Sequence, residues 1–375
     1  MTALHTDTLA RKFNNRNLGF SYGNTTVPLL LFQDDVVKFD KSHNDLQLSN
    51  IILESYEHEN KMEYHPTKTM AMTNDTNCHQ VILNNQPLPT TDEYKYLGDI
   101  VTINNNLQPL IAERKSIITG TVAEIVTLIN QTRQYSLTAA TQYLEGVIQP
   151  KLILNAESWN VIPEEDLKQI EKIYSQSIKR LLHLPYSTPT KGLYSELGIM
   201  NIQNQIIKKK LMFLHRILNK PNNTLSKIIL FEQEDLPGNN WLKTTKTHMK
   251  DLQIEYNPEE LQKISKYIWK KQVEEALWKK EQKDLEEWTK TSKKCSHLKN
   301  MKAKNYIKQL APLKAKIILE IRLGILDVKE NYHGKHQDTI CRNCKKYDET
   351  AEHFIRCLTD NETGPIKYLP EVWTT

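Results

Sequence analysis

The chain has little glycine and no long apolar segment. Only 11 of its 375 residues are glycine, which argues against a sheet protein built on many tight turns. No apolar run approaches the ~18 residues that a membrane-spanning helix needs. The first residues also lack the apolar centre of a signal peptide. We therefore expect a soluble, intracellular protein that has no membrane partner.

Cysteine is also scarce, and its distribution argues against a disulfide framework. The chain has 5 cysteines. Cys78 and Cys295 are isolated in the sequence, whereas Cys341, Cys344 and Cys357 lie close together. A disulfide-stabilised domain is short and rich in cysteine pairs, while a local cluster in an intracellular protein is typical of a metal site.

The residues that are abundant favour helices and, near the N-terminus, short strands. Hydrophobic residues make up 39% of the chain, and its length of 375 residues predicts two to four folding units. The runs "VPLLLF", "VVKF", "TMAMT", "QVILNNQPL" and "EYKYLGDIV" predict strands and hairpins within residues 1–110, with a helix in "LQLSNIILESYEHENKM". From residue 111 on, the patterns are helical. The predicted fold class is α+β.

Three later stretches predict long helices. The run from Pro163 to Leu182 has proline at its start, acidic residues in its first turn and basic residues at its end, as the helix dipole favours. The stretches "IQNQIIKKKLMFLHRILNK" and "PEELQKISKYIWKKQVEEALWKKEQKDLEEW" each predict one helix. Trp269, Trp278 and Trp288 follow one another at spacings of nine and ten residues, which do not keep one helical face. We assign them to packing between helices.

The net charge is uneven along the chain. Residues 1–110 contain 8 basic and 13 acidic side chains, which leaves 42 basic and 32 acidic ones in residues 111–375. The first segment therefore carries −5 and the rest +10. Such an imbalance is expected where an acidic metal site stands beside a body that binds phosphates. A solvated helical surface rich in lysine explains the same counts.

The most specific local pattern is a C-x2-C-x8-H-x3-C spacing in "CRNCKKYDETAEHFIRC". Its members are Cys341, Cys344, His353 and Cys357. A tight C-x2-C turn and a short helix with histidine and cysteine four residues apart would supply the four ligands of tetrahedral zinc. The ion would also contribute folding energy to a segment with few apolar residues. The alternative is a coincidence of residues in a disordered tail. We expect His333 and His336, close by, to face solvent or nucleic acid.

Two adjacent carboxylates, Asp34 and Asp35, interrupt the apolar stretch "VPLLLFQDDVVKF". Aspartate is common in tight turns, so the pair fits the tip of an ordinary hairpin. The same tip would hold two carboxylates rigidly in solvent, as a two-metal phosphoryl-transfer site with Mg²⁺ requires. The pair by itself leaves both interpretations open.

Segments spread over nearly the whole chain together resemble reverse transcriptases of non-LTR retrotransposons. Phe32-Gln33-Asp34-Asp35 is similar to their F-x-D-D motif, "KMEYHPTKTMAM" to the turn and strand that follow it, and "EYKYLGDIV" to the Y-L-G hairpin that grips the primer end. "SIKRLLHLP" and "ELGIMNIQNQIIKKKLMFLHRIL" resemble the helical thumb and the linker after it. The cysteine and histidine spacing matches their C-terminal zinc knuckle.

The resemblance implies a fold and a set of catalytic roles. The implied parts are a partial palm over residues 1–110, thumb-like helices over 111–184, a basic helical linker over 185–330, and a zinc knuckle with a tail over 331–375. Asp34 would bind two Mg²⁺ ions together with an aspartate from an earlier strand, and Asp35 would support that geometry. Lys68 would protonate or steady the leaving pyrophosphate.

The resemblance also implies an RNA or DNA template–primer as partner. Tyr96, Leu97 and Gly98 would form the primer grip, where Gly98 lets the backbone approach the primer strand. Basic residues of the linker would hold the duplex by its phosphates, with affinity that depends on salt and little on sequence. These basic residues are Lys208, Lys209, Lys210 and Arg216.

The sequence departs from the family pattern before Asp34. Only 33 residues precede it, and Asp7 is the single carboxylate among them. The family has its first metal-binding aspartate on a strand well upstream, and residues 1–14 resemble only the last turns of the helix between. We therefore expect a fragment or decayed copy of a polymerase, inactive by itself. The alternative is a non-enzymatic protein that binds RNA or DNA through its thumb, linker and zinc knuckle.

Overall fold

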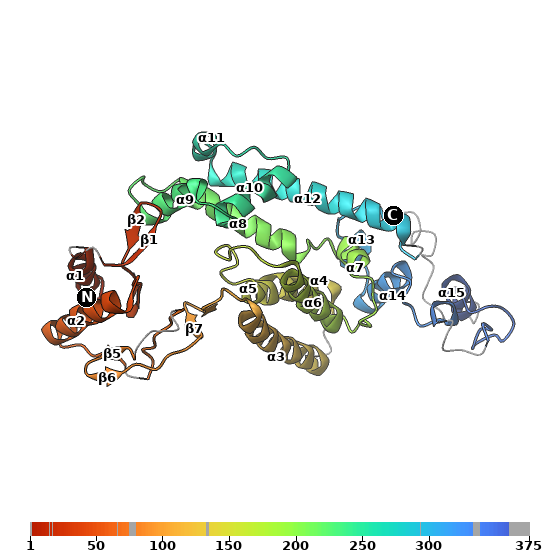
Figure 1. Ribbon diagram of the computed structural model, residues 1–375. Helices are drawn as coiled ribbons and strands as arrows, with labels where there is room; N and C mark the ends of the chain where they lie inside the picture. The colour runs from red at the N-terminus through yellow and green to blue at the C-terminus, as the bar shows by residue number, and fades with distance from the viewer. Residues whose placement is uncertain are drawn as a thin grey trace. The chain divides into compact units, whose positions relative to one another are not determined.

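The chain forms two compact units, seen in a computed structural model (Figure 1). The described residues are 2–14, 16, 18–65, 67–74, 80–132, 135–292, 294–332 and 338–359. Unit 1 comprises Met1–Leu110, Glu157–Ile162 and Lys210–Ser265, and unit 2 comprises Ile111–Ala156, Pro163–Lys209 and Lys266–Thr375. Cys78, His333 and His336 lie outside the described residues. Helices together with antiparallel hairpins confirm the α+β class.

Unit 1 begins with helix α1 (Thr2–Asn14) and contains a series of hairpins. The first two are β1 (Phe20–Tyr22) with β2 (Thr25–Val27), and β3 (Leu29–Phe32) with β4 (Asp35–Lys38). Helix α2 (His43–Asn60) follows. The next two hairpins are β5 (Ile82–Leu83) with β6 (Gln86–Pro87), and β7 (Glu93–Tyr96) with β8 (Asp99–Thr102). Each sheet over the described ranges has two antiparallel strands.

Two-residue turns close these hairpins. The first central residue has a positive φ at Gly23 (+57°) and Gln33 (+56°), and both central residues do at Asn84–Asn85 and Leu97–Gly98. Hairpins favour such turns because their twist matches the twist of the flanking strands. The first hairpin was not predicted from the sequence, although the Gly23-Asn24 pair at its tip is a turn signal.

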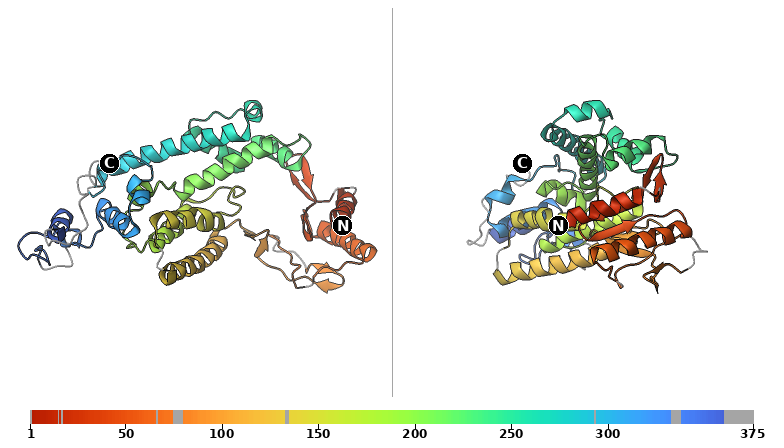
Figure 2. Two further views of the ribbon diagram at one scale, coloured as in Figure 1. Left: turned by 180° about the vertical axis from the view of Figure 1, so that it is seen from behind. Right: turned by 90° about the vertical axis from the view of Figure 1, so that its left-hand side faces the viewer.

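Helices α1 and α2 lie side by side (Figure 2). They share a core with the hairpins. The buried side chains of this core are Leu9, Phe13, Leu18, Leu29, Ile52, Leu53, Tyr56 and Leu83. Helix α2, predicted from its sequence, starts where the Ser42 hydroxyl accepts a hydrogen bond from Asp45 N, and it ends at Lys61 in the left-handed conformation. On the outer face of the β3–β4 hairpin, Leu30 and Phe32 are exposed.

The other regular elements of unit 1 are helices. They are the second half of α8 (Ile202–Leu218), then α9 (Leu225–Asp235), α10 (Trp241–Asp251) and α11 (Pro258–Lys263). Helices α9 and α10 pack on each other. The rings of Phe213 and Trp241 meet edge to face with centroids 5.7 Å apart, a geometry that aromatic pairs favour.

The regular secondary structure of unit 2 is helical in its described residues. Its elements are α3 (Gln108–Thr132), α4 (Leu137–Tyr143), the π-helical η1 (Leu144–Ile148), α5 (Gln149–Leu152), α6 (Glu164–Leu181), α7 (Thr190–Leu197), the first half of α8, α12 (Lys266–Thr291), α13 (Asn305–Gln309), α14 (Pro312–Arg322), the 3-10 helix η2 (Lys329–Tyr332) and α15 (Ala351–Thr359). Helix α6 confirms the helix predicted from Pro163, and it buries Ile170, Tyr174 and Ile178.

Two predictions about secondary structure were wrong. The stretch after Asn257 forms two helices, because Ile264 between α11 and α12 is extended and its carbonyl oxygen lies 2.9 Å from Nε2 of His215. That interaction gives the carbonyl a partner outside a helix. The "TMAMT" run forms a single bridge, between Ala71 and Thr90, and no strand.

None of the helices in the described ranges is long and apolar enough to cross a bilayer.

Candidate functional site

Cys341 and Cys344 stand on a tight turn whose backbone N–H groups point at sulfur. The N–H of Lys345 donates to the carbonyl of Cys341 at 2.9 Å and closes the turn. The N–H of Asn343 donates to Cys341 Sγ at 3.4 Å. A hydrogen bond from the N–H of Lys346 is the main cause that lowers the pKa of Cys344 to about 6. Such donors stabilise the thiolate, which is the form that binds metals.

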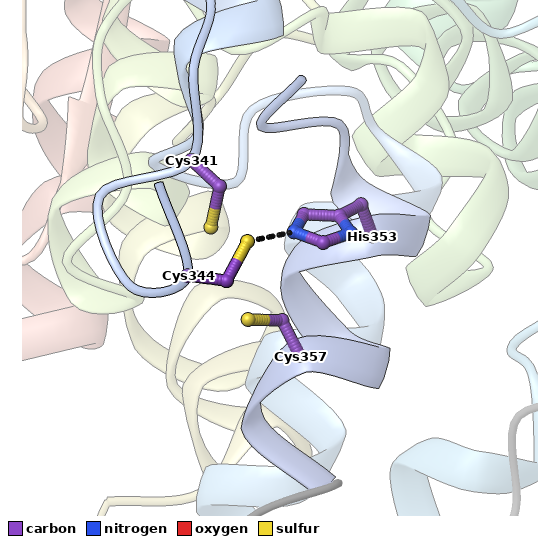
Figure 3. Close-up of side chains that lie close together, drawn as sticks. All are labelled: Cys341, Cys344, His353 and Cys357. Atoms are coloured by element: carbon purple, nitrogen blue, oxygen red, sulfur yellow. Dashed lines mark hydrogen bonds between the residues drawn. The ribbon is translucent and has the colours of Figure 1, made fainter. Parts of the chain in front are cut away.

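Helix α15 presents the other two candidate ligands. His353 and Cys357 lie four residues apart on one side of this helix and point toward the two cysteines of the turn (Figure 3). The N–H of His353 donates to the Thr350 hydroxyl at 3.0 Å, just before the helix begins. One ligand atom from each of the four residues lies within 4.8 Å of the others. Cys344 Sγ lies 3.2 Å from Nε2 of His353.

The donor set fits a structural metal ion. Three cysteine sulfurs and one imidazole are the ligands of many tetrahedral zinc sites. Four protein ligands leave no open position for water or substrate, and this distinguishes a structural zinc site from a catalytic one. The cluster could therefore bind a metal ion such as zinc.

A buried carboxylate fastens the cysteine turn to the segment before it. Glu349 is 1% exposed. It accepts hydrogen bonds from the N–H of Lys329 at 3.1 Å, from the N–H of Arg342 at 2.7 Å and from Nε of Arg342 at 2.9 Å. Burial raises the pKa of Glu349, but its bonds with Arg342 outweigh burial and hold this pKa below its ordinary value. Glu349 was not predicted from the sequence, because no local spacing marks it.

Apolar contacts fasten the same segment to α14. Ala351 and Phe354 of α15 pack against a small cluster formed by Ile321, Leu326 and Val328. The four candidate metal ligands therefore belong to a segment that packs against α14 and the residues after it within unit 2.

Asp34 and Asp35 lie at the exposed tip of the β3–β4 hairpin. Phe32 pairs with Asp35, so Gln33 and Asp34 form the turn. Within the described part of the chain, the one close group of three or more potential metal ligands is the cysteine and histidine cluster. Neither aspartate belongs to such a group, so these residues by themselves give no support for a Mg²⁺ site.

The Y-L-G motif forms the tip of the β7–β8 hairpin. Tyr96 pairs with Asp99, which places Leu97 and Gly98 in the turn with φ of +48° and +90°. Burial raises the pKa of Tyr96, and the negative charge of Asp35 raises it further. The two motif-bearing tips therefore lie near each other within unit 1.

Lys68 lies in an exposed turn between α2 and β5. Its backbone is tied to the hairpin of the Y-L-G motif, because its carbonyl oxygen accepts a hydrogen bond from the Tyr94 hydroxyl at 3.2 Å. Its N–H donates to the carbonyl of His65 at 3.1 Å. The structure thus places this lysine in the same unit as Asp34 and Gly98.

The predicted phosphate-binding residues of α8 differ in their surroundings. Lys208 forms an ion pair with Glu274 at 2.6 Å. The ammonium group of Lys209 donates to the carbonyl of Ile153 at 2.8 Å. Arg216 is exposed. Of these three, Arg216 is the cation most open to an approaching phosphate.

Lys210 is the buried member of the predicted set. It is 1% exposed, and its ammonium group donates to the carbonyl of Asn160 at 2.7 Å. Burial lowers the pKa of Lys210 from 10.5 to about 8, since an apolar environment disfavours the charged form. A phosphate has no access to this ammonium group in the folded chain.

We expect the buried Lys210 to make stability depend on pH. The pKa of Lys210 is about 8 in the folded chain and 10.5 ordinarily. Between these two pH values, the unfolded chain keeps a proton that the folded chain has lost. The free energy of unfolding therefore rises with pH across this window, by about 3 kcal/mol at most. Urea denaturation at several pH values should show the rise in the wild type and lose it in Lys210→Met. Lys263→Met, an exposed control in unit 1, should keep it. An unchanged rise in Lys210→Met would contradict this origin.

Comparison of the chain with protein-family models and with curated proteins gives no match. A functional interpretation therefore depends on the metal-ligand cluster, the two hairpin tips and the distribution of charge.

Proposed function

We propose that this chain is a zinc-binding protein that binds RNA or DNA, descends from a non-LTR reverse transcriptase, and synthesises no DNA by itself. The observation that carries the proposal is the convergence of three cysteines and His353 within 4.8 Å. Zinc knuckles are recurrent nucleic-acid-binding modules, and this cluster has the spacing by which the chain resembles the family. The excess of basic residues in 111–375 supports a phosphate-bearing partner.

The hairpin tips support the proposed descent. The F-x-D-D and Y-L-G motifs both occupy two-residue turns, and the charge of Asp35 acts on Tyr96. A palm over residues 1–110 would bring these two motifs together at a primer end. The thumb over 111–184, the linker over 185–330 and the knuckle over 331–375 complete the proposed organisation.

The absence of synthesis follows from the metal chemistry. Two-metal nucleotidyl transfer needs carboxylates from more than one place in the chain, because both ions must be held and bridged. Among the described residues, no third carboxylate or imidazole groups with Asp34 and Asp35. The exposed position of these two aspartates at a hairpin tip is the observation that favours the polymerase alternative, so the test includes synthesis.

We expect the zinc-loaded chain to bind a labelled primer annealed to an RNA template and to leave the primer unextended. Binding is measured by fluorescence anisotropy from about 50 to 200 mM salt, where affinity should fall steeply as counterions are released. The same samples then receive deoxynucleotides with Mg²⁺ or Mn²⁺. Asp34→Asn is the matched control, and it should bind at least as well because it removes a negative charge.

The two parts of this proposal fail separately. Absent binding, or binding that does not change with salt, contradicts the nucleic-acid partner. Primer extension by the wild type that Asp34→Asn abolishes contradicts the absence of synthesis and makes the chain an active polymerase.

A further inference from the structure

A cleft runs along helix α12 in unit 2, between this helix and residues 300–303. Its volume is about 770 Å³. The lining includes Trp278, Lys279, Lys283, Met301 and Lys302. None of these residues belongs to the cysteine and histidine cluster or to the motifs of unit 1.

Hydrogen bonds hold the walls of the cleft in place. The side-chain amide of Gln282 on α12 donates to the carbonyl of Lys299 at 2.8 Å and accepts from the N–H of Met301 at 3.2 Å. From the other side, the hydroxyl of Ser195 donates to the carbonyl of Asn300 at 2.8 Å. The segment opposite α12 is therefore fixed by side chains on two helices.

Close backbone packing fixes the same wall at Gly198. This residue follows α7 with φ of +68°, and a Cβ atom there would lie 2.5 Å from the N atom of Ala303. Only glycine allows this approach. The cleft is thus formed before any ligand arrives.

The tryptophans of α12 differ in exposure. Trp269 is 1% exposed, which agrees with the predicted role in packing between helices. Trp278 is partly exposed and lines the cleft, so packing does not account for all of its surface. An indole face open to a cleft is a platform for a flat aromatic ligand.

The charges around Trp278 favour an anionic ligand. Lys279, Lys283 and Lys302 are exposed, and their ammonium groups have no hydrogen bond or ion pair in the described part of the chain. The lining also contains two glutamates. Glu275 lies 4.0 Å from Lys271, and Glu286 accepts a hydrogen bond from Gln282 at 2.7 Å. Three lysines against two glutamates, one of which pairs with Lys271 outside the cleft, leave a net positive charge beside the indole.

We propose that this cleft binds single-stranded RNA or DNA, with one base stacked on Trp278 and the adjoining phosphates held by Lys279, Lys283 and Lys302. An aromatic face flanked by free cations is the arrangement by which proteins bind single strands, because each base offers a π face and each nucleotide a negative charge. Bases in a duplex are already stacked and offer no free face. The inference rests on the proposed function and adds a site to it.

The test compares variants of the full zinc-loaded chain in binding to a labelled single-stranded oligonucleotide. Trp278→Leu should weaken binding at least about fivefold, the lower end for loss of one stacked base, while Trp278→Phe, which keeps an aromatic face, should lose less. Changing Lys279, Lys283 and Lys302 to glutamine should reduce the salt slope by about 0.7 for each phosphate that is no longer neutralised. An oligonucleotide with a photoreactive pyrimidine should crosslink to Trp278.

A charge-matched control distinguishes binding in this cleft from non-specific electrostatic attraction to the lysines of unit 2. Lys290, Lys308 and Lys314 are exposed residues of unit 2 outside the cleft, and their change to glutamine should alter affinity and salt slope less. If the wild type binds single strands while the cleft variants and the control lose affinity equally, the cleft proposal fails and the proposed function stands. If the wild type binds no nucleic acid, both fail. Single-stranded RNA, single-stranded DNA and duplex probes of the same length show which kind of nucleic acid the cleft prefers. Crosslinking of Trp278 to a duplex as strong as to a single strand would also overturn the proposal.

Discussion

Replacement of Cys344 by alanine is expected to unfold residues 338–359 and to release the metal. Among the described side chains of the segment, Ala351 and Phe354 make the apolar contacts with the cluster around Val328. Zinc binding to comparable sites provides about 10–16 kcal/mol of apparent free energy at neutral pH, far more than two partly buried side chains provide. Without the ion, only the packing of Ala351 and Phe354 and the hydrogen bonds of Glu349 would keep three cysteine sulfurs and His353 within 4.8 Å of one another.

The measurement is hydrogen exchange of the backbone amides in α15 and the cysteine turn, together with the zinc content of the purified chain. Protection of these amides and zinc content should both fall in Cys344→Ala and on chelation under reducing conditions. Cys295→Ala is the matched control, because Cys295 is a buried cysteine outside the cluster, and it should retain zinc and protection in α15. Unchanged protection of α15 after complete removal of zinc would contradict a structural role for the metal.

A second large loss of stability is expected when a buried ion pair that joins α7 to α14 is broken. Glu196 and Arg322 are 0% and 3% exposed, and Nε of Arg322 lies 2.9 Å from Oε2 of Glu196. The Tyr306 hydroxyl donates to the same oxygen at 2.7 Å. Glu196→Ala leaves a buried guanidinium without its balancing charge, which costs about 3–5 kcal/mol in comparable pairs. Removing both charges together, in Glu196→Leu with Arg322→Met, should cost much less.

Urea denaturation measures this loss of unfolding free energy, and hydrogen exchange of the backbone amides in α7 and α14 shows where it occurs. Lys316 and Glu320 on α14 provide a control pair, since both are 21% exposed and their charges lie 3.8 Å apart. Glu320→Ala should cost less than about 1 kcal/mol, because solvent screens a partly exposed pair. Equal losses from Glu196→Ala and Glu320→Ala, or a double variant as unstable as Glu196→Ala, would contradict the role given to the buried charges.

The features predicted well from the sequence are those encoded by neighbouring residues. The C-x2-C turn and the histidine and cysteine of α15 bring all four candidate ligands into 17 consecutive residues, 341–357. The turn residues of the β3–β4 and β7–β8 hairpins are adjacent to the strands that they join. Local chemistry decides such structures, because the partners meet without a long loop to close.

Predictions from residue type alone did not distinguish buried side chains from exposed ones. Lys208, Lys209, Lys210 and Arg216 have similar charges on one predicted helix, yet Lys210 is buried and Arg216 is exposed. Trp269 and Trp278 likewise share α12 and differ in exposure. The surroundings of each residue come from distant segments, which no spacing within the helix records.

The sequence by itself determined the α+β class, the metal-ligand spacing, the hairpin tips and the uneven charge, because composition and short-range periodicity specify them. Only the tertiary structure decided the break between α11 and α12, the pairing of Glu196 with Arg322 and the cleft beside Trp278. Each of these depends on groups far apart in the chain, as the sequence separation of 126 between Glu196 and Arg322 illustrates. Burial and long-range hydrogen bonding arise only when such segments pack together.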